Sequence, residues 1–183
     1  FRKTSLPKWC QHKIHIVKNT PGDISFSKPP TFDGKIKLFY GGWLNWGRGI
    51  KELINIAESN PNIDIRIAGS GSDDIISFIE KHNSVTYLGH ISHKQSIIET
   101  QNAHFIPSFY NPSTIINRYA ASNKLAEAMA VGRPLLINSE MEIIKSFKGR
   151  NSYLSYDYEN ISNIGADFFQ LMNEKNKYIE MCK

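Results

Sequence analysis

The stretch SNKLAEAMAVGRPLLIN, residues 122–138, places a short, largely apolar helix directly before a glycine and an apolar strand. Residues 133–139, RPLLINS, have the pattern of a strand. A helix that leads straight into such a strand is the repeating unit of α/β proteins with a parallel sheet. The same unit is therefore expected elsewhere in the chain.

Strand and helix patterns alternate along almost the whole sequence. Strands are expected at residues 13–17, 35–42, 63–71, 84–89, 103–108 and 133–139. Helical patterns separate the strands from 35–42 onward, and the first of them has Ile50, Leu53, Ile54 and Ala57 at helical spacing. Residues 25–34 resemble a linker, 109–121 a long polar loop, and 160–181 one long amphipathic helix. This order predicts an α/β fold, a Rossmann-like parallel sheet with helices on both faces.

Composition narrows the classes of protein to consider. The 183 residues are 40% hydrophobic, which is enough for one domain with a core, and no apolar run is long enough to cross a bilayer. The net charge of +5 suits phosphate-bearing ligands or an anionic membrane surface, but the dispersed lysines argue against nucleic acid. Neither the histidines nor Cys10 and Cys182 have metal-ligand spacing. Because the chain begins Phe-Arg-Lys, we expect a trimmed protein or a fragment.

Several predicted strands end in glycine or serine, at Gly42, Gly69, Gly89 and Ser108. Parallel sheets bind ligands beyond the carboxyl ends of their strands, and glycine lets the backbone approach a ligand closely. Neither a dinucleotide fingerprint nor a P-loop is present, so a tight turn is the favoured explanation of each glycine taken alone. Arg48, near the start of the next helix, favours phosphate slightly.

Lys124 and Glu127 lie three residues apart at the start of the quoted helix, on one helical face. A surface ion pair is one interpretation. However, the helix dipole opposes a lysine in the first turn and favours an anion there. A phosphate bound by Lys124 and the helix amides would remove the conflict, and Glu127 would then accept hydrogen bonds from sugar hydroxyls. Position alone leaves both interpretations open.

The same stretch resembles the E-A-M-A-x-G-x-P-V-I signature of retaining glycosyltransferases with the GT-B fold. In these enzymes it lies in the carboxy-terminal domain, and the class is the group 1 or family 4 type of bacterial surface-polysaccharide transferases. Other segments resemble further motifs of that domain in the correct order, and they are residues 13–23, 37–54, 65–73, 85–92 and 103–113. The similarity extends from about residue 13 to residue 155, and the order makes it more specific than any single motif.

The resemblance implies roles for particular residues. Glu127 matches the second glutamate of the E-x7-E motif, which binds the ribose hydroxyls. Arg48 matches a phosphate-binding lysine, and Lys124 occupies a position near the donor phosphates. Backbone groups near His90 would meet the base. The residues expected to bind the donor are therefore Gly42, Arg48, Gly89, His90, Ser122, Asn123, Lys124 and Glu127.

This chain also departs from the pattern of that family. Trp43 replaces an arginine that contacts phosphate, and Tyr119 stands where the first glutamate of E-x7-E is expected. Asn111 replaces an acidic residue. The residue that touches the donor sugar and the catalytic residue are therefore not assigned, and Asn117, Arg118 and Tyr119 are candidates for the sugar contact.

The amino-terminal half of these enzymes, which binds the acceptor, has no counterpart in this sequence. We therefore expect an entry segment with the first strand at residues 1–34 and a nucleotide-sugar-binding domain at residues 35–155. Residues 156–183 would form a helix that crosses to the other half. Without that half, the apolar face of this helix would be exposed or repacked, and it includes Ile161, Ile164, Phe168 and Leu171.

The expected function is donor binding in a glycosyltransferase, with UDP as the first choice of nucleotide. The sugar would pass, with retention, to a lipid-linked glycan in O-antigen or capsule synthesis. We expect no metal or other cofactor, and a location in the cytoplasm or at the inner face of the membrane. Two alternatives remain open: a nucleotide-sugar 2-epimerase of the same fold, and a non-catalytic nucleotide-binding or interaction module.

Overall fold

The computed structural model describes residues 7–14, 22, 24–147 and 149–183. The strands are β1 (Ile36–Gly41), β2 (Ile63–Ala68), β3 (Val85–Tyr87), β4 (Ile106–Ser108), β5 (Leu135–Asn138) and β6 (Tyr153–Tyr156). The α-helices are α1 (Lys8–Gln11), α2 (Ile50–Ser59), α3 (Asp73–Glu80), α4 (His93–Asn102), α5 (Ile115–Arg118), α6 (Asn123–Val131), α7 (Gly165–Asn173) and α8 (Lys175–Met181). Short 3-10 helices lie at η2 (Trp46–Arg48), η3 (Glu142–Phe147) and η4 (Tyr158–Asn163).

In the described part of the chain, six strands pair in parallel and lie in the order β3-β2-β1-β4-β5-β6. Regular pairing gives two groups of three strands, and a parallel bridge between Leu38 and Phe105 joins β1 to the entry of β4. The His104 amide donates to the Lys37 carbonyl at 2.7 Å across the same junction. This is the Rossmann strand order. Strands β1 to β3 are added outward on one side of the sheet and β4 to β6 outward on the other, so the strand order reverses between β1 and β4 while all strands stay parallel. The reversal is the point at which such sheets bind ligands.

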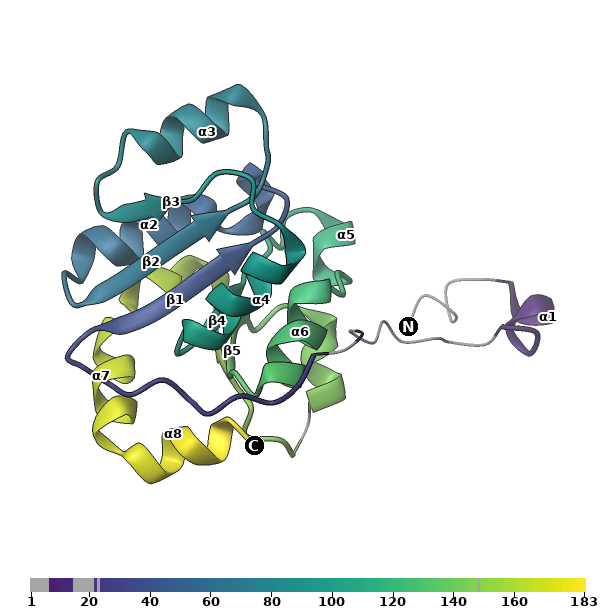
Figure 1. The fold of residues 1–183 in the computed structure, drawn as a ribbon. Helices are drawn as coiled ribbons and strands as arrows, with labels where there is room; N and C mark the ends of the chain where they lie inside the picture. The colour runs from purple at the N-terminus through teal and green to yellow at the C-terminus, as the bar shows by residue number, and fades with distance from the viewer. Residues whose placement is uncertain (1–6, 15–21, 23, 148) are drawn as a thin grey trace.

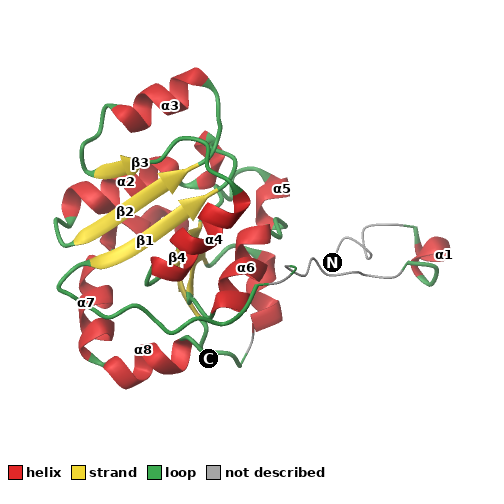
Figure 2. Ribbon diagram, viewed as in Figure 1, coloured by secondary structure: helices red, strands yellow, loops and turns green. Residues whose placement is uncertain are grey.

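Helices cover both faces of the sheet, as the sequence predicts (Figures 1 and 2). Successive side chains of a strand point to opposite faces, so Leu38 and Tyr40 belong to one buried cluster and Phe39 to the other. The first cluster contains residues of α2, α3, α7 and α8, and the second contains residues of α6. In Figure 1, α4 lies in front of the sheet and α2 behind it.

The carboxy-terminal segment differs from the expected single helix. Residues 158–181 form η4, α7 and α8, with a break at Glu174, which has non-helical backbone angles. Phe168 and Tyr178 both contact the Phe105 ring, with centroid distances of 5.0 and 5.5 Å. Ten residues of straight helix span about 15 Å, so the chain must bend for both side chains to reach one ring. Ile161, Ile164 and Phe168 are fully buried in this domain, so this face is packed rather than exposed.

The strand expected at residues 13–17 falls mostly outside the described residues, which omit 15–21. Strand β6 was not expected, and the loop expected at residues 109–121 contains α5. The loop also begins with two buried aromatic residues, Phe109 and Tyr110, because the Tyr110 amide donates to the Asn138 side chain at 2.8 Å and holds the loop on β5.

Candidate functional site

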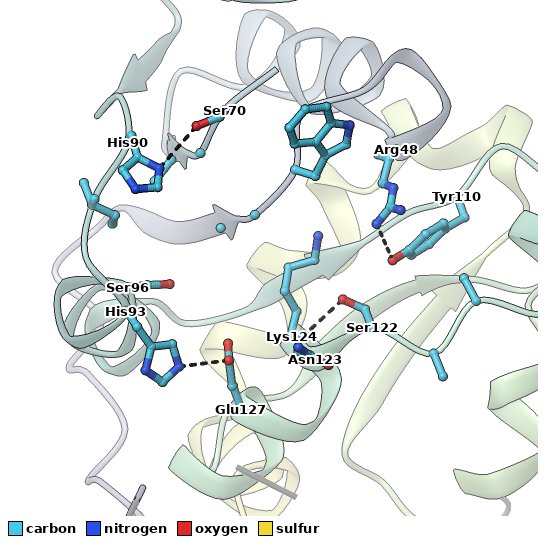
Figure 3. A pocket seen from close by; sticks show the side chains of 18 of the residues that line it. Arg48, Ser70, His90, His93, Ser96, Tyr110, Ser122, Asn123, Lys124 and Glu127 are labelled. Atoms are coloured by element: carbon cyan, nitrogen blue, oxygen red, sulfur yellow. Dashed lines mark hydrogen bonds and ion pairs between the residues drawn. The ribbon is translucent and has the colours of Figure 1, made fainter. Parts of the chain in front are cut away.

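A cavity of about 920 Å³ lies at the carboxyl ends of β1 and β2, where the strand order reverses. Figure 3 shows Lys124 near its centre, with Ser70 and His90 on one side and Arg48 and Tyr110 on the other. The cavity is lined by seven of the residues expected to bind the donor, and these are Gly42, Arg48, His90, Ser122, Asn123, Lys124 and Glu127. Gly89 lies beside the wall, where its carbonyl accepts from the Gly69 amide at 2.9 Å.

Two glycine turns form the floor beyond β1 and β2. Gly69 has φ +141°, and a Cβ atom there would lie 1.7 Å from the Gly42 carbonyl oxygen. The Gly42 amide in turn donates to the Ala68 carbonyl at 3.0 Å. Only glycine fits at Gly69, since any side chain would collide with the neighbouring turn. The two turns pack directly on each other and bring their backbone to the cavity.

Lys124 lies in the first turn of α6, whose N-cap is Ser122. The Ser122 hydroxyl accepts from the Lys124 amide at 3.2 Å. The lysine side chain is only 9% exposed, and its ammonium nitrogen lies 3.7 Å from the centroid of the Tyr40 ring. Desolvation, followed by the nearby positive charge of Arg48, lowers the pKa of Lys124 to about 7, while Glu127 opposes the shift. The surface ion pair is therefore the wrong interpretation, because Lys124 is buried and points into the cavity.

Arg48 enters the cavity from the end of η2. Its guanidinium donates to the Tyr110 hydroxyl at 3.0 Å and lies 4.8 Å from the centre of the Tyr110 ring. Gly49 follows in the left-handed conformation and lets α2 start at once. Arg48 and Lys124 therefore supply two cations to one cavity from elements on either side of the sheet reversal.

Glu127 lies one turn beyond Lys124 on α6. Its Oε1 atom is 3.1 Å from Nε2 of His93, the first residue of α4 (Figure 3). The Glu127 carboxylate is thus held in place by His93, which itself lines the cavity. On another wall of the cavity, the Ser70 hydroxyl lies 3.2 Å from Nδ1 of His90.

Sequence reasoning missed Tyr40, Ser70, His93 and Tyr110 as parts of the site. No local motif marks them, because each becomes relevant only when two elements meet in space. Of the candidates for the sugar contact, Asn117 lines the cavity, whereas Arg118 and Tyr119 are not among the lining residues. The Asn117 amide group donates to the carbonyls of Asn111 and Gly47, at 3.0 and 3.4 Å.

The arrangement suits an elongated anion with hydroxyl groups. The N-terminus of α6, Lys124 and Arg48 provide amide donors and positive charge for phosphate groups. Glu127 provides an acceptor for hydroxyl donors at one side. Within the described residues, three or more His, Cys, Asp or Glu side chains do not gather into a metal site. Likewise, no helix of the described part is both long and apolar enough for a membrane crossing.

Comparison with solved structures identifies the fold. The chain aligns with TarM at a TM-score of 0.68 and 18% identity, over 91% of this chain and 33% of TarM. It aligns with the C-terminal domain of LpcC, a group 1 glycosyl transferase from Francisella tularensis, at a TM-score of 0.62 and 12% identity, over 85% of this chain and 83% of the LpcC domain. HepE from Anabaena, in complex with UDP and glucose, aligns at a TM-score of 0.65 and 12% identity, over 81% of this chain and 42% of HepE. No protein-family model and no curated protein matches the sequence.

The chain therefore has the fold of one Rossmann-like domain of a GT-B glycosyltransferase, with parallel strands between helical layers. The identities are low, so the likeness establishes the fold and not the activity. The chain spans about a third of TarM and less than half of HepE, but most of the isolated LpcC domain.

Proposed function

We propose that this chain is the donor-binding domain of a glycosyltransferase that uses a nucleotide-diphosphate sugar. The observation that carries the proposal is the meeting of Lys124, Arg48 and Glu127 in one cavity at the reversal of the strand order. Lys124, Arg48 and the amides of α6 bind the diphosphate, and Glu127 binds the ribose hydroxyls. The base lies toward Gly89, His90 and Ser70. UDP is the nucleotide we propose first, which the UDP complex of HepE supports by analogy.

In the complete enzyme, a second domain brings the acceptor, and we propose a lipid-linked glycan of O-antigen or capsule synthesis at the cytoplasmic face of a membrane. The sugar is transferred with retention. Arg48, Lys124 and the helix amides stabilise the negative charge that develops on the departing diphosphate. These groups neutralise it without a metal ion, so the proposal includes no cofactor. The net positive charge favours a peripheral contact with an anionic membrane.

The test is calorimetric titration of the chain with UDP, GDP and ADP, followed by UDP and 2′-deoxy-UDP with Glu127→Gln. We expect UDP to bind most tightly, and Glu127→Gln to weaken UDP by about 10- to 100-fold, as for a lost hydrogen bond to a charged group. The same substitution should affect 2′-deoxy-UDP less. Glu159→Gln, at an exposed position distant in sequence, is the matched control. Equal losses with both nucleotides would exclude a hydrogen bond from the ribose 2′-hydroxyl to Glu127.

A nucleotide-sugar epimerase is the second candidate, because His90, His93 and Glu127 bring possible proton-transfer groups into the same cavity. Assays of the full-length protein distinguish the two reactions. A transferase releases UDP from UDP-sugar only when a glycan acceptor is present, whereas a 2-epimerase changes the sugar without an acceptor. A protein that binds UDP and does neither would be a non-catalytic module.

A further inference from the structure

Trp43 stands at the cavity but has no part in the proposed nucleotide contacts. It follows Gly42 in the loop after β1 and lines the cavity while 58% exposed. A Cβ atom at Gly42 would lie 3.9 Å from the Lys124 ammonium nitrogen. The loop therefore approaches the proposed phosphate site at Gly42, and Trp43 is the next residue along the chain.

The backbone around Trp43 is fixed on both sides. The Tyr40 hydroxyl donates to the Trp43 carbonyl at 3.0 Å, and the Leu44 amide donates to the Ser70 carbonyl at 2.8 Å. Leu44 itself is buried. Exposure of Trp43 is thus built into the loop, although a buried indole would stabilise the protein through a large apolar surface.

Ile116, on α5, supplies a second apolar group to the same cavity and is 67% exposed. Its loop is tied to the Trp43 loop, because the Gly47 carbonyl accepts from the Asn111 amide at 2.9 Å and from the Asn117 side chain at 3.4 Å. Two exposed apolar side chains therefore line the cavity on connected loops, next to cations and hydroxyl groups.

We propose that Trp43, with Ile116, forms an apolar platform for the pyranose ring of the nucleotide sugar. This inference rests on the proposed function. The ring is attached to the distal phosphate, so a diphosphate held by Lys124 and Arg48 places it next to the loop of Trp43. A pyranose carries C–H groups on its faces and hydroxyl groups around its rim. An indole beside polar groups matches this mixed surface, since its face is apolar and its N–H is a donor.

Trp46 provides a matched control in the same loop. It is 44% exposed, but its indole nitrogen donates to the Asp74 carboxylate at 2.6 Å and its ring packs 5.0 Å from Phe78. Trp46 is not among the residues that line the cavity. A substitution of Trp46 thus tests the general effect of losing an exposed tryptophan from this loop.

The experiment measures, by calorimetry, the affinity for UDP and for three UDP-sugars: UDP-glucose, UDP-galactose and UDP-N-acetylglucosamine. Each ligand is titrated into the wild-type chain, Trp43→Ala and Trp46→Phe. The quantity of interest is the ratio of the Kd for UDP to the Kd for the UDP-sugar. For the preferred sugar we expect a wild-type ratio of about 5 to 10, from burial of roughly 50 Å² of apolar surface. Trp43→Ala should reduce the ratio to about 1, and Trp46→Phe should leave it unaltered.

Fluorescence gives a second measurement that does not depend on this ratio. In a chain with Trp9→Phe and Trp46→Phe, the UDP-sugar should protect Trp43 from acrylamide quenching more than UDP does. A ratio that is unchanged in Trp43→Ala, a wild-type ratio of 1, or equal quenching with both ligands would overturn the platform while UDP binding still supports the nucleotide site. Absence of UDP binding would overturn both the platform and the proposed function.

Discussion

The ammonium nitrogen of Lys124, which lines the cavity, lies 3.7 Å from the centre of the Tyr40 ring. The ring face attracts the cation, but burial removes the water that would otherwise solvate it. Arg48 adds a second positive charge nearby and Glu127 a negative one. The pKa of Lys124 therefore falls to about 7, whereas burial raises the pKa of Tyr40 above its ordinary value. The cavity holds a cation that an anionic ligand would stabilise.

We expect UDP binding to take up a proton at alkaline pH. A bound diphosphate favours the charged amine and raises the pKa of Lys124, so binding above pH 7 must protonate it. Affinity should fall about tenfold between pH 7 and pH 8.5, where the free lysine becomes neutral. Calorimetry in buffers of different ionisation enthalpy measures the proton uptake directly. Lys124→Met should lose this dependence of UDP affinity on pH. An unchanged pH dependence in that variant would assign the proton uptake to another group.

Lys124→Met should weaken UDP binding by about 10- to 100-fold, because it removes a charged hydrogen bond to phosphate. The free protein should become more stable. The folded-state pKa of about 7 is below the unfolded value of 10.5, so the unfolded state binds more protons between these values and wild-type stability rises with pH across that window.

The stabilisation by methionine should therefore be largest at or below pH 7, at about 1–4 kcal/mol, and smaller at pH 9.5. Urea unfolding of both proteins at pH 6.5 and 9.5 measures this difference. A gain of equal size at both pH values would mean that the lysine is not buried as a strained cation.

Gly69→Ala should destabilise the protein by about 3 kcal/mol or more, because the added methyl group meets the Gly42 carbonyl in addition to an unfavourable φ angle. Gly34→Ala is the control, since Gly34 also has a positive φ but open space around its Cβ position. That variant should lose only about 1–2 kcal/mol. Urea denaturation compares the two, and similar losses would show that the turns do not pack as described.

Arg133→Lys should cost about 3 kcal/mol of stability without changing the affinity for UDP. The buried Arg133 guanidinium donates to carbonyls of Ser27, Lys28 and Gln101, among others, and ties the entry segment to α4 and α6. Lysine cannot reach these divergent acceptors. Arg150→Lys, at an exposed arginine, is the control. Thermal unfolding and UDP titration should separate stability from binding, and a loss of affinity would contradict a purely structural role.

The sequence by itself determined the alternation of strands and helices, because periods of two and 3.6 residues are local properties that apolar burial imposes. It also identified seven of the residues that line the cavity, since glycine turns and the start of α6 follow the carboxyl ends of strands. Tertiary structure decided what no local pattern encodes. The break at Glu174 arises because Phe168 and Tyr178 pack on one ring. Likewise, Lys124 turns toward Tyr40, and Glu127 meets His93, only because α6, β1 and α4 converge at the reversal of the sheet.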